Sequence, residues 1–419
     1  MISAGWVLPL DGPPIENGFV RFEGGRITEV GEGRAERHYP DAVIVPGFVN
    51  AHSHLEYAVY AGFGDGLAFG PWIAMHMERK LRLDRTQMLD IARAGAGESL
   101  RSGITMTADY SFSGTAADAA DQLGLRAIVY LEVFAQEPAD AEAQFEKTRA
   151  LVSESELVRI GISPHAPYTC SVDVYRWCLS LGIPVGTHLT ESANENEWLV
   201  HGTGPFAGNP VMIPPTGKRA VPTLEPVLGP DLLCAHCVDL EPDELQLLAD
   251  RDVPVAHCPR SNALLGCGIA PLTALRAAGV RVGLGTDSPA STPSFDMFEE
   301  MRTAVYMARA RDRQANGLTG EEALRLATID AARALRMDAE VGTLTPGKRA
   351  DLTVVSLAGS PYHPMEDPAA AVVFGGSPER VLETVVEGKT RYRTGDNEWQ
   401  EVRSTASAAR GLMLAPQQP

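Results

Sequence analysis

Hydrophobic runs alternate with amphipathic segments along most of the chain. Stretches rich in Ala, Leu, Glu and Arg show the helical period at 85–102, 141–153, 172–181, 242–250 and 271–278, and again at 319–335. Eight apolar runs predict buried strands at 42–52, 104–109, 126–132, 158–163, 184–188, 232–236, 253–257 and 280–287. Because strands that alternate with helices pair in parallel, we predict an α/β fold with a TIM-like (β/α)₈ barrel.

Both ends of the chain have a different pattern. Short alternating segments at 18–23 and 26–30 are separated by glycine-rich turns, and similar segments return at 350–355 and 385–392. We therefore predict that 1–46 and 345–402 together form a small β-sandwich domain, that 47–344 forms the barrel, and that 403–419 is a polar tail. The Pro- and Gly-containing stretch 202–229 is expected to lie over the mouth of the barrel.

Composition narrows the class of protein. With 44% hydrophobic and 21% charged residues, the 419-residue chain is typical of a globular protein. Its formal net charge of −18 disfavours binding to nucleic acid or to anionic membranes, so a small-molecule substrate is expected. No run of 18 apolar residues and no secretory signal pattern is present, which predicts a cytoplasmic location. The sequence leaves a homodimer open.

The six cysteines lack the dense spacing of a secreted disulfide framework, so free thiols are expected. Cys234 and Cys237 have the spacing of a redox or zinc motif. No second such pair and no helix start follow them, which disfavours that interpretation.

Ligand-type residues end strand after strand. His52 and His54 close the first apolar run and, two residues apart, point to the same side of a strand. Each could be an ordinary hydrogen-bonded residue, but such endings on successive strands are improbable by chance, and we predict a metal site. The further strand-end residues are His188, His236, His257 and Asp287.

Zinc suits this donor set. Three imidazoles, from His52, His54 and His188, and the carboxylate of Asp287 would leave a position for an activated water. A second metal would need a bridging ligand, which in related hydrolases is commonly a carboxylated lysine at the fourth strand. That strand ends at His165 instead, and none of Lys80, Lys147, Lys218, Lys348 and Lys389 is placed to serve. We therefore expect one Zn²⁺ per chain, with Fe²⁺ as the alternative.

Two further groups can move protons. Glu191 lies three residues after His188, near enough to shuttle a proton between water and a ring nitrogen, although an exposed loop glutamate is the alternative. His236 either ligates the metal or orients the water, and we favour orientation. Asp287 is expected to ligate weakly and to accept the proton of the water.

The motifs resemble those of the amidohydrolase superfamily, in the branch that contains cytosine, guanine and S-adenosylhomocysteine deaminases and the chlorohydrolases. The resemblance spans essentially the whole chain and implies zinc at His52, His54, His188 and Asp287. It also implies that Glu191 protonates the heterocycle, that His236 holds the hydroxide and that Asp287 is the general base. The matching runs are 46–54, 163–171, 188–192, 235–238, 257–262 and 285–288.

The same resemblance suggests a substrate. The run ending at His165 is similar to the part of S-adenosylhomocysteine and adenosine deaminases that touches the sugar, which favours a 6-aminopurine nucleoside. Residues 188–192 and 285–288 are most similar to aminodeoxyfutalosine deaminases of menaquinone biosynthesis, which convert 6-amino-6-deoxyfutalosine to futalosine and ammonia. Adenosine, methylthioadenosine and S-adenosylhomocysteine are further candidates. Pro289 and Thr292 depart from the usual Leu and Asn, and the segment after Trp72 matches poorly.

Residues for the rest of the substrate are less defined. Trp72 is either an aromatic wall above the ligand or a core residue in the first barrel loop. A benzoate tail needs a cationic partner, for which Arg260, Arg79 and Arg126 are candidates, each equally able to be a surface charge.

Two rival functions remain open from the sequence. One is another mononuclear amidohydrolase of the chlorohydrolase, guanine deaminase or cytosine deaminase type, because one fold supports several displacement reactions. The other is a metal-free binding or scaffold protein that keeps the barrel.

Overall fold

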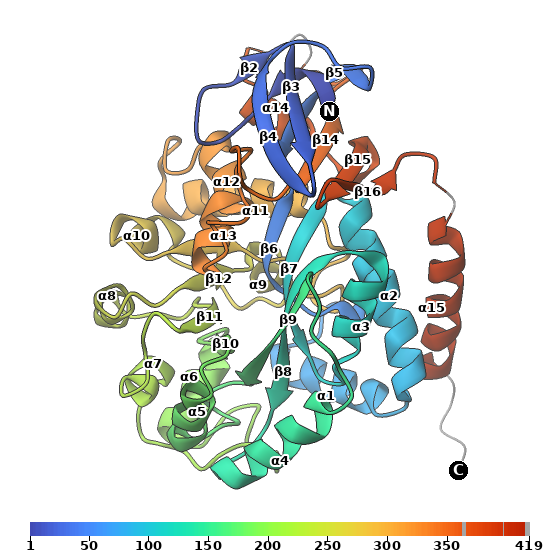
Figure 1. The fold of residues 1–419 in the computed structure, drawn as a ribbon. Coiled ribbons are helices and arrows are strands. Elements are labelled where there is room, and N and C mark those ends of the chain that lie inside the picture. Colours follow the sequence, from blue (N-terminus) through green and yellow to red (C-terminus); the bar gives the residue numbers. More distant parts are fainter. Residues whose placement is uncertain (363–365, 397, 415–419) are drawn as a thin grey trace.

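A barrel of eight parallel strands forms the centre of the protein (Figure 1). The computed structural model describes residues 1–362, 366–396 and 398–414. Each barrel strand pairs with the next in the sequence, and the barrel closes where the Asp287 N–H donates to the His52 carbonyl at 3.0 Å. The strands are β6 (Phe48–Ser53), β7 (Ile104–Ser111), β8 (Arg126–Val133), β9 (Val158–Pro164), β10 (Val185–Leu189), β11 (Leu232–His236), β12 (Val255–His257) and β13 (Val282–Leu284).

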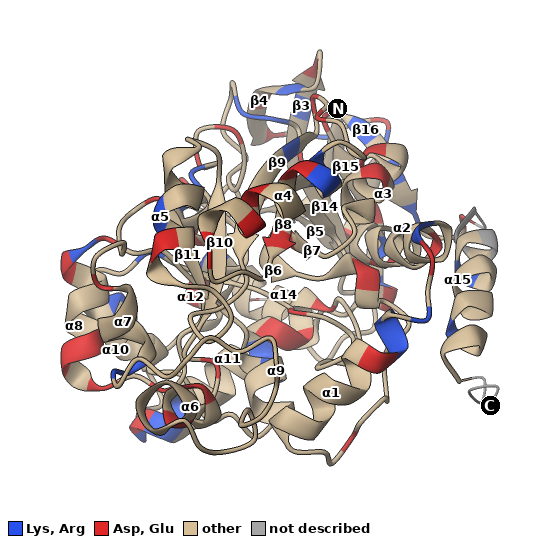
Figure 2. Cartoon of the chain, turned by 90° about the horizontal axis from the view of Figure 1, so that it is seen from below, with Lys and Arg blue, Asp and Glu red and all other residues tan. Residues whose placement is uncertain are grey.

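Helices surround the barrel, and many of the charged side chains lie on them. Figure 2 shows Lys, Arg, Asp and Glu mainly on outer helices such as α4, α6 and α8, as expected where only one helix face packs on the strands. The helices of this part are α1 (Phe69–Lys80), α2 (Arg85–Arg101), α3 (Thr115–Leu123), α4 (Pro138–Arg149), α5 (Val172–Ser180), α6 (Ala193–His201), α7 (Ala220–Leu224), α8 (Pro242–Asp250), α9 (Pro259–Leu264), α10 (Leu272–Ala277), α11 (Met297–Asp312), α12 (Gly320–Leu326) and α13 (Ile329–Ala334). The short 3₁₀ helix η1 (Leu55–Tyr57) follows β6.

A second, mixed sheet joins the two ends of the chain, as predicted (Figure 1). Strand β5 pairs in parallel with β1 and antiparallel with β14, so the C-terminal strands extend the N-terminal ones. Its strands are β1 (Ile2–Val7), β2 (Ile15–Glu16), β3 (Gly18–Glu23), β4 (Arg26–Glu32), β5 (His38–Pro46), β14 (Leu352–Ser356), β15 (Val381–Val386) and β16 (Lys389–Arg393). The 3₁₀ helix η2 (Pro378–Arg380) precedes β15, and helix α14 (Pro368–Gly375) lies before it.

The predicted strand at 42–52 is two strands. Strand β5 ends at Pro46 in the mixed sheet, and β6 starts at Phe48 in the barrel. Between them, a Cβ on Gly47 would lie 2.1 Å from the Thr105 hydroxyl oxygen, so the crossing between sheets has no room for a side chain. The apolar run was continuous because both strands are buried, and periodicity alone does not show such a change of sheet.

Three other predicted elements differ in extent. The helix expected at 319–335 is interrupted between α12 and α13, where the carbonyl of Ala327 accepts a hydrogen bond from Val49 of β6. Strand β13 ends at Leu284, so Asp287 lies beyond it with a φ of 54°. The residues from Arg403 onward, expected to be a polar tail, belong as far as Leu414 to helix α15 (Glu398–Leu414), which packs on α2. Residues 415–419 of that predicted tail lie outside the described part.

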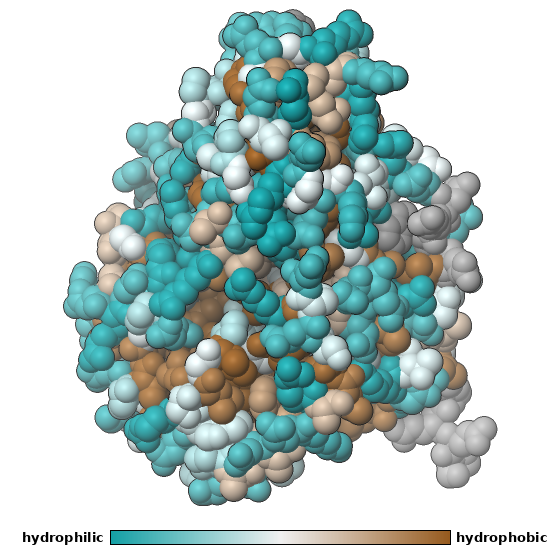
Figure 3. All heavy atoms as spheres, in the orientation of Figure 1, coloured by the Kyte–Doolittle hydropathy of each residue, from teal (hydrophilic) through white to brown (hydrophobic). Residues whose placement is uncertain are grey.

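The core and surface agree with this layout. The cysteines are free thiols as expected, and Cys234 and Cys237 are buried. Figure 3 shows hydrophilic residues over most of the mixed sheet at the top and hydrophobic residues gathered around α5 and α6. Among the described residues, none of the helices combines the length and hydrophobicity needed to cross a bilayer.

Candidate active site

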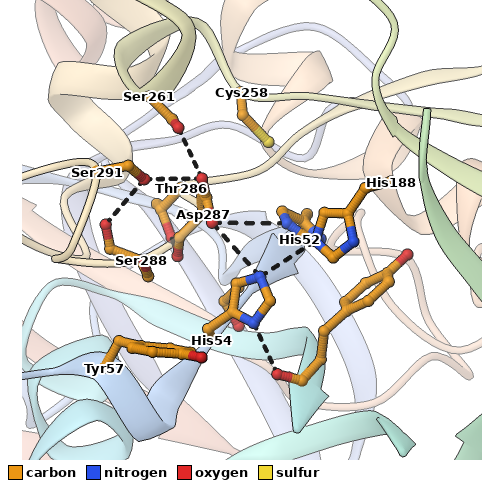
Figure 4. A network of polar contacts seen from close by, with 12 residues as sticks. His52, His54, Tyr57, His188, Cys258, Ser261, Thr286, Asp287, Ser288 and Ser291 are labelled. Carbon is orange, nitrogen blue, oxygen red and sulfur yellow. Dashed lines mark hydrogen bonds and ion pairs between the residues drawn. The ribbon is translucent and has the colours of Figure 1, made fainter. Parts of the chain in front are cut away.

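The predicted strand-end residues converge at the carboxyl ends of the barrel strands (Figure 4). Asp287 Oδ1 lies 3.6 Å from His52 Nε2 and 3.5 Å from His54 Nε2, and His54 Nε2 lies 3.3 Å from His188 Nε2. His236 joins the same group, because its ring lies within ligand distance of the His52 and His188 rings. His257 belongs to none of the metal-type clusters found among the described residues.

Backbone contacts orient two of these imidazoles toward the centre. His54 Nδ1 lies 2.8 Å from the Tyr110 carbonyl, and His188 Nδ1 lies 2.9 Å from the His165 carbonyl. Because a carbonyl only accepts, each Nδ1 carries the proton, and each Nε2 presents a lone pair. Two lone pairs 3.3 Å apart repel each other unless a cation lies against both, so this pair fits a metal ion.

The remaining imidazole leads to the same conclusion. Both ring nitrogens of His52 are buried without a hydrogen-bond partner among the described residues. An orphaned buried polar atom is costly and requires an explanation. Burial lowers the pKa of His52, His54 and His188, to about 3 for His54 and about 4 for His188, so all three rings are neutral, as metal ligands must be. The donor set therefore fits a metal ion.

Two serines hold Asp287, and sequence reasoning missed them. Ser261 and Ser291 donate hydrogen bonds of 2.6 and 2.7 Å to Asp287 Oδ2, which leaves Oδ1 facing His52 and His54 (Figure 4). Burial acts to raise the pKa of Asp287, but the imidazoles outweigh it and hold the pKa well below its usual range. Ser261 lies in a matched motif, yet nothing in the sequence shows that its hydroxyl reaches a residue 26 positions away.

Removing one of these hydroxyls should loosen the carboxylate without removing a ligand. We expect Ser291→Ala to lower metal affinity or turnover about 10-fold to 100-fold, the usual effect of losing a group that orients a metal ligand. Metal titration and steady-state kinetics on the folded variant measure this. Unchanged values would show that Ser261 alone fixes Asp287.

His236 has a different environment from the other rings. Its Nδ1 lies 3.0 Å from the side-chain nitrogen of Asn262, which donates to it and thereby places the ring proton on Nε2. Nε2 points toward Glu191, whose carboxylate oxygen lies 3.9 Å away. Its backbone is left-handed, with a φ of 76°, where β11 ends. In this arrangement the Nε2–H can donate a hydrogen bond.

Glu191 is buried and not an exposed loop residue. Burial, reinforced by Asp287 and Glu195, raises the pKa of Glu191 well above its usual range. Glu195 itself accepts a hydrogen bond from the Glu191 N–H at 3.1 Å, and burial raises the pKa of Glu195 to about 8. A carboxyl group that stays protonated near neutral pH can donate a proton to a substrate.

A cavity of about 340 Å³ opens above these groups. His165, Trp72, His188, Glu191, His236 and Asp287 all line it, as do Asn209, Val211 and Met212 from the stretch expected over the barrel mouth. Trp72 lies on helix α1 and not in a loop, and its indole N–H donates to the Ala290 carbonyl at 3.3 Å. His165 stacks on Phe134 with 4.5 Å between ring centroids.

The three arginines expected near a substrate tail do not line this cavity. Arg260 pairs with Glu300 and Glu299 on α11. Arg126 pairs with Asp351 and Glu387, joining the barrel to the mixed sheet. The Arg79 guanidinium lies over the Phe63 ring, 3.9 Å from its centroid. The sequence showed the charge of each residue but not the carboxylate or ring that it meets after folding.

Known proteins of related sequence match this chain over most of its length. The chain is 34% identical to a 5-methylthioadenosine/S-adenosylhomocysteine deaminase of Syntrophobacter fumaroxidans, over 93% of this chain and 92% of that protein. It is 30% identical to a 5′-deoxyadenosine deaminase of Methanothermobacter thermautotrophicus, over 93% of this chain and 92% of that one.

Solved structures resemble it over nearly the whole length. A zinc-bound adenosine deaminase from Xanthomonas campestris superposes with a TM-score of 0.88 at 26% identity, covering 98% of both chains. A zinc complex of atrazine chlorohydrolase from Arthrobacter aurescens shares the fold, with a TM-score of 0.83 at 20% identity, covering 99% of this chain and 100% of that one. The model of the Amidohydrolase family matches residues 43–391. Together with the arrangement of the strand-end residues, these matches show that the chain belongs to the amidohydrolase family and is a hydrolase that acts on carbon–nitrogen bonds.

Proposed function

We propose that this protein is a zinc-dependent deaminase of 6-aminopurine nucleosides, with 6-amino-6-deoxyfutalosine as the first candidate substrate. The observation that carries the proposal is that possible metal ligands and a possible proton donor lie together at one end of the cavity. His52, His54 and Asp287 offer ligand atoms within 4.8 Å of one another, His188 Nε2 lies 3.3 Å from His54 Nε2, and Glu191, whose pKa is raised, lies beside His236. The names of the relatives, which are deaminases of adenine nucleosides, support the same class of reaction.

His52, His54, His188 and Asp287 are the residues that would hold a single zinc ion. A bound zinc ion supplies Lewis-acid activation of water at neutral pH. Iron accepts the same donors, so Fe²⁺ is the alternative cofactor. Two cations would need a bridging group between them, and Lys80, the one lysine among the described lining residues, donates to the Tyr57 hydroxyl instead.

The chain's own residues then move the protons. Asp287 Oδ1 accepts a proton from the attacking water, while His236 Nε2–H donates a hydrogen bond to its oxygen. As the C6–O bond forms, Glu191 donates its proton to N1 of the purine. The C6–N bond then breaks, the proton held by Asp287 leaves with the amine as ammonia, and the remaining hydroxyl proton on C6 returns to Glu191 as the C6=O bond forms. The product is the 6-oxo nucleoside.

The cavity supports a nucleoside over a bare base. Its aromatic lining, which includes Trp72, Phe134 and Tyr168, offers stacking surfaces, and His165 and Glu132 offer polar atoms beside the histidine cluster. His165 and Trp72 are therefore proposed to contact the sugar and base.

A substrate panel tests this proposal. Zinc-loaded protein is assayed for ammonia release from adenosine, 5′-methylthioadenosine, S-adenosylhomocysteine, 6-amino-6-deoxyfutalosine and guanine, and for chloride release from atrazine. We expect turnover of the adenine nucleosides, with 6-amino-6-deoxyfutalosine giving the highest kcat/KM. If none of the adenine nucleosides released ammonia, the proposed function would be refuted.

A further inference from the structure

One buried cation in the cavity has no place in the chemistry described above. Lys80, the last residue of α1, is only 4% exposed, yet its side chain lines the cavity. Its ammonium donates to the Tyr57 hydroxyl at 2.9 Å and lies 3.9 Å from the centroid of the Phe112 ring. Within the described ranges, Lys80 forms no ion pair with a carboxylate.

None of the acidic side chains around Lys80 forms an ion pair with its ammonium in the described residues. Glu56 is engaged elsewhere, because it accepts hydrogen bonds from Ser113 and Thr115 at the start of α3. Glu132 lies toward the histidine cluster, within ligand distance of His165 and His188, and makes no direct contact with the ammonium in the described structure. The ammonium thus has only a hydroxyl and a ring in direct contact: burial lowers its pKa, and the charges of Glu132 and Glu56 offset this only in part.

The other cations near the cavity are already paired or point elsewhere. Arg260 is held by two glutamates, and Arg79 lies against Phe63 outside the cavity lining. Among the described lining residues, Lys80 is the one Lys or Arg side chain. Besides the acidic Glu132, the cavity lining includes the aromatic and apolar side chains of Phe112, Phe134 and Ile73. This combination is suited to an apolar or aromatic group that ends in a negative charge.

We propose that Lys80 binds a carboxylate at the end of the substrate's 5′ substituent and so determines specificity for acidic nucleosides. This inference rests on the proposed function, because the purine must lie at the histidine cluster for its 5′ substituent to extend toward Lys80. Glu132 and His165, which line the cavity and cluster with His188, are then left for the sugar hydroxyls. The aromatic lining favours an aryl carboxylate over the zwitterionic amino acid of S-adenosylhomocysteine.

A matched pair of substrates tests the proposal without any mutation. The wild-type, zinc-loaded protein is assayed on 6-amino-6-deoxyfutalosine and on its methyl ester, which differ only in the negative charge. A charge-assisted hydrogen bond predicts a kcat/KM about 10-fold to 100-fold higher for the acid. Equal values for acid and ester would overturn the proposal.

Variants then locate the effect. Lys80→Met should raise the KM for the acid about 10-fold to 100-fold and leave kcat/KM for the ester within about twofold. Lys80→Arg should keep a preference for the acid. The exposed Lys147 on α4 supplies the control, and Lys147→Met should match the wild type. An equal loss on acid and ester in Lys80→Met, at unchanged zinc content, would show that Lys80 only supports the fold.

Binding measurements separate this proposal from the function on which it rests. If no nucleoside is deaminated, the proposed function fails, and calorimetric binding of 6-amino-6-deoxyfutalosine and its ester to the zinc-loaded protein still tests Lys80. Tighter binding of the acid in the wild type, lost in Lys80→Met, supports the carboxylate site. Equal affinity for acid and ester refutes it. Tighter binding of S-adenosylhomocysteine than of the aryl carboxylate would overturn the choice of an aryl tail.

Discussion

Glu191→Gln is expected to lower kcat by about 10²-fold to 10⁴-fold while the protein keeps its zinc. The amide has nearly the same shape as the carboxyl group but cannot deliver a proton to N1. Glu191 is buried, and its carboxylate oxygen lies 3.9 Å from His236 Nε2. Because Glu191 is not part of the proposed ligand set, the metal site should remain intact in this variant. Steady-state ammonia release together with elemental analysis of the purified variant measures both quantities.

Helix α6, which follows Glu191 in the chain, offers a matched control for this substitution. Glu197 lies on α6, six residues further along, and its side chain is exposed. Glu197→Gln should therefore retain wild-type turnover. Near-normal activity in Glu191→Gln would mean that another group protonates the base, and loss of zinc in that variant would mean that Glu191 supports the metal site.

His188→Ala is expected to abolish both zinc binding and turnover. The substitution removes an Nε2 that lies 3.3 Å from that of His54 and is oriented by the His165 carbonyl. Loss of a group that only orients a ligand costs 10-fold to 100-fold in metal affinity, so loss of the ligand itself should cost more than about 100-fold. Competition with a chelator of known affinity measures the change.

A histidine at another strand end controls for the loss of a buried ring. His257 ends β12 and is buried, but it joins no metal-type cluster among the described residues. His257→Gln should keep zinc at the wild-type level. If His188→Ala retained full zinc content and activity, the ligand assignment would be wrong, and His236 would be the next ring to examine.

The sequence predicted the metal-type cluster because the barrel itself brings its members together. His52, His54, His188 and His236 stand at the ends of strands whose apolar runs are easily recognised, and parallel strands of a barrel share one carboxyl edge. Asp287 was found although it lies beyond β13, because the apolar run extends toward it. Periodicity thus located the residues without resolving the strand ends.

Residues that act through three-dimensional contacts were not predictable in this way. Lys80 was considered only as a bridging ligand, because the sequence does not show that α1 folds back over the barrel mouth and buries its last side chain. The arginines failed as tail ligands for the converse reason, since their carboxylate partners come from distant segments. The break between β5 and β6 was missed because both sheets bury the same kind of residue.

The central claim is that one metal ion lies among the strand-end residues, and anomalous X-ray scattering at the zinc edge from crystals of the zinc-loaded protein tests it most directly. The account predicts one anomalous peak per chain, with His52 Nε2, His54 Nε2, His188 Nε2 and Asp287 Oδ1 at about 2.0–2.2 Å from it. His236 and Glu191 should lie outside that distance. Two peaks at this cluster, a peak ligated by His236 in place of one of these residues, or no peak in crystals of active protein would contradict the account.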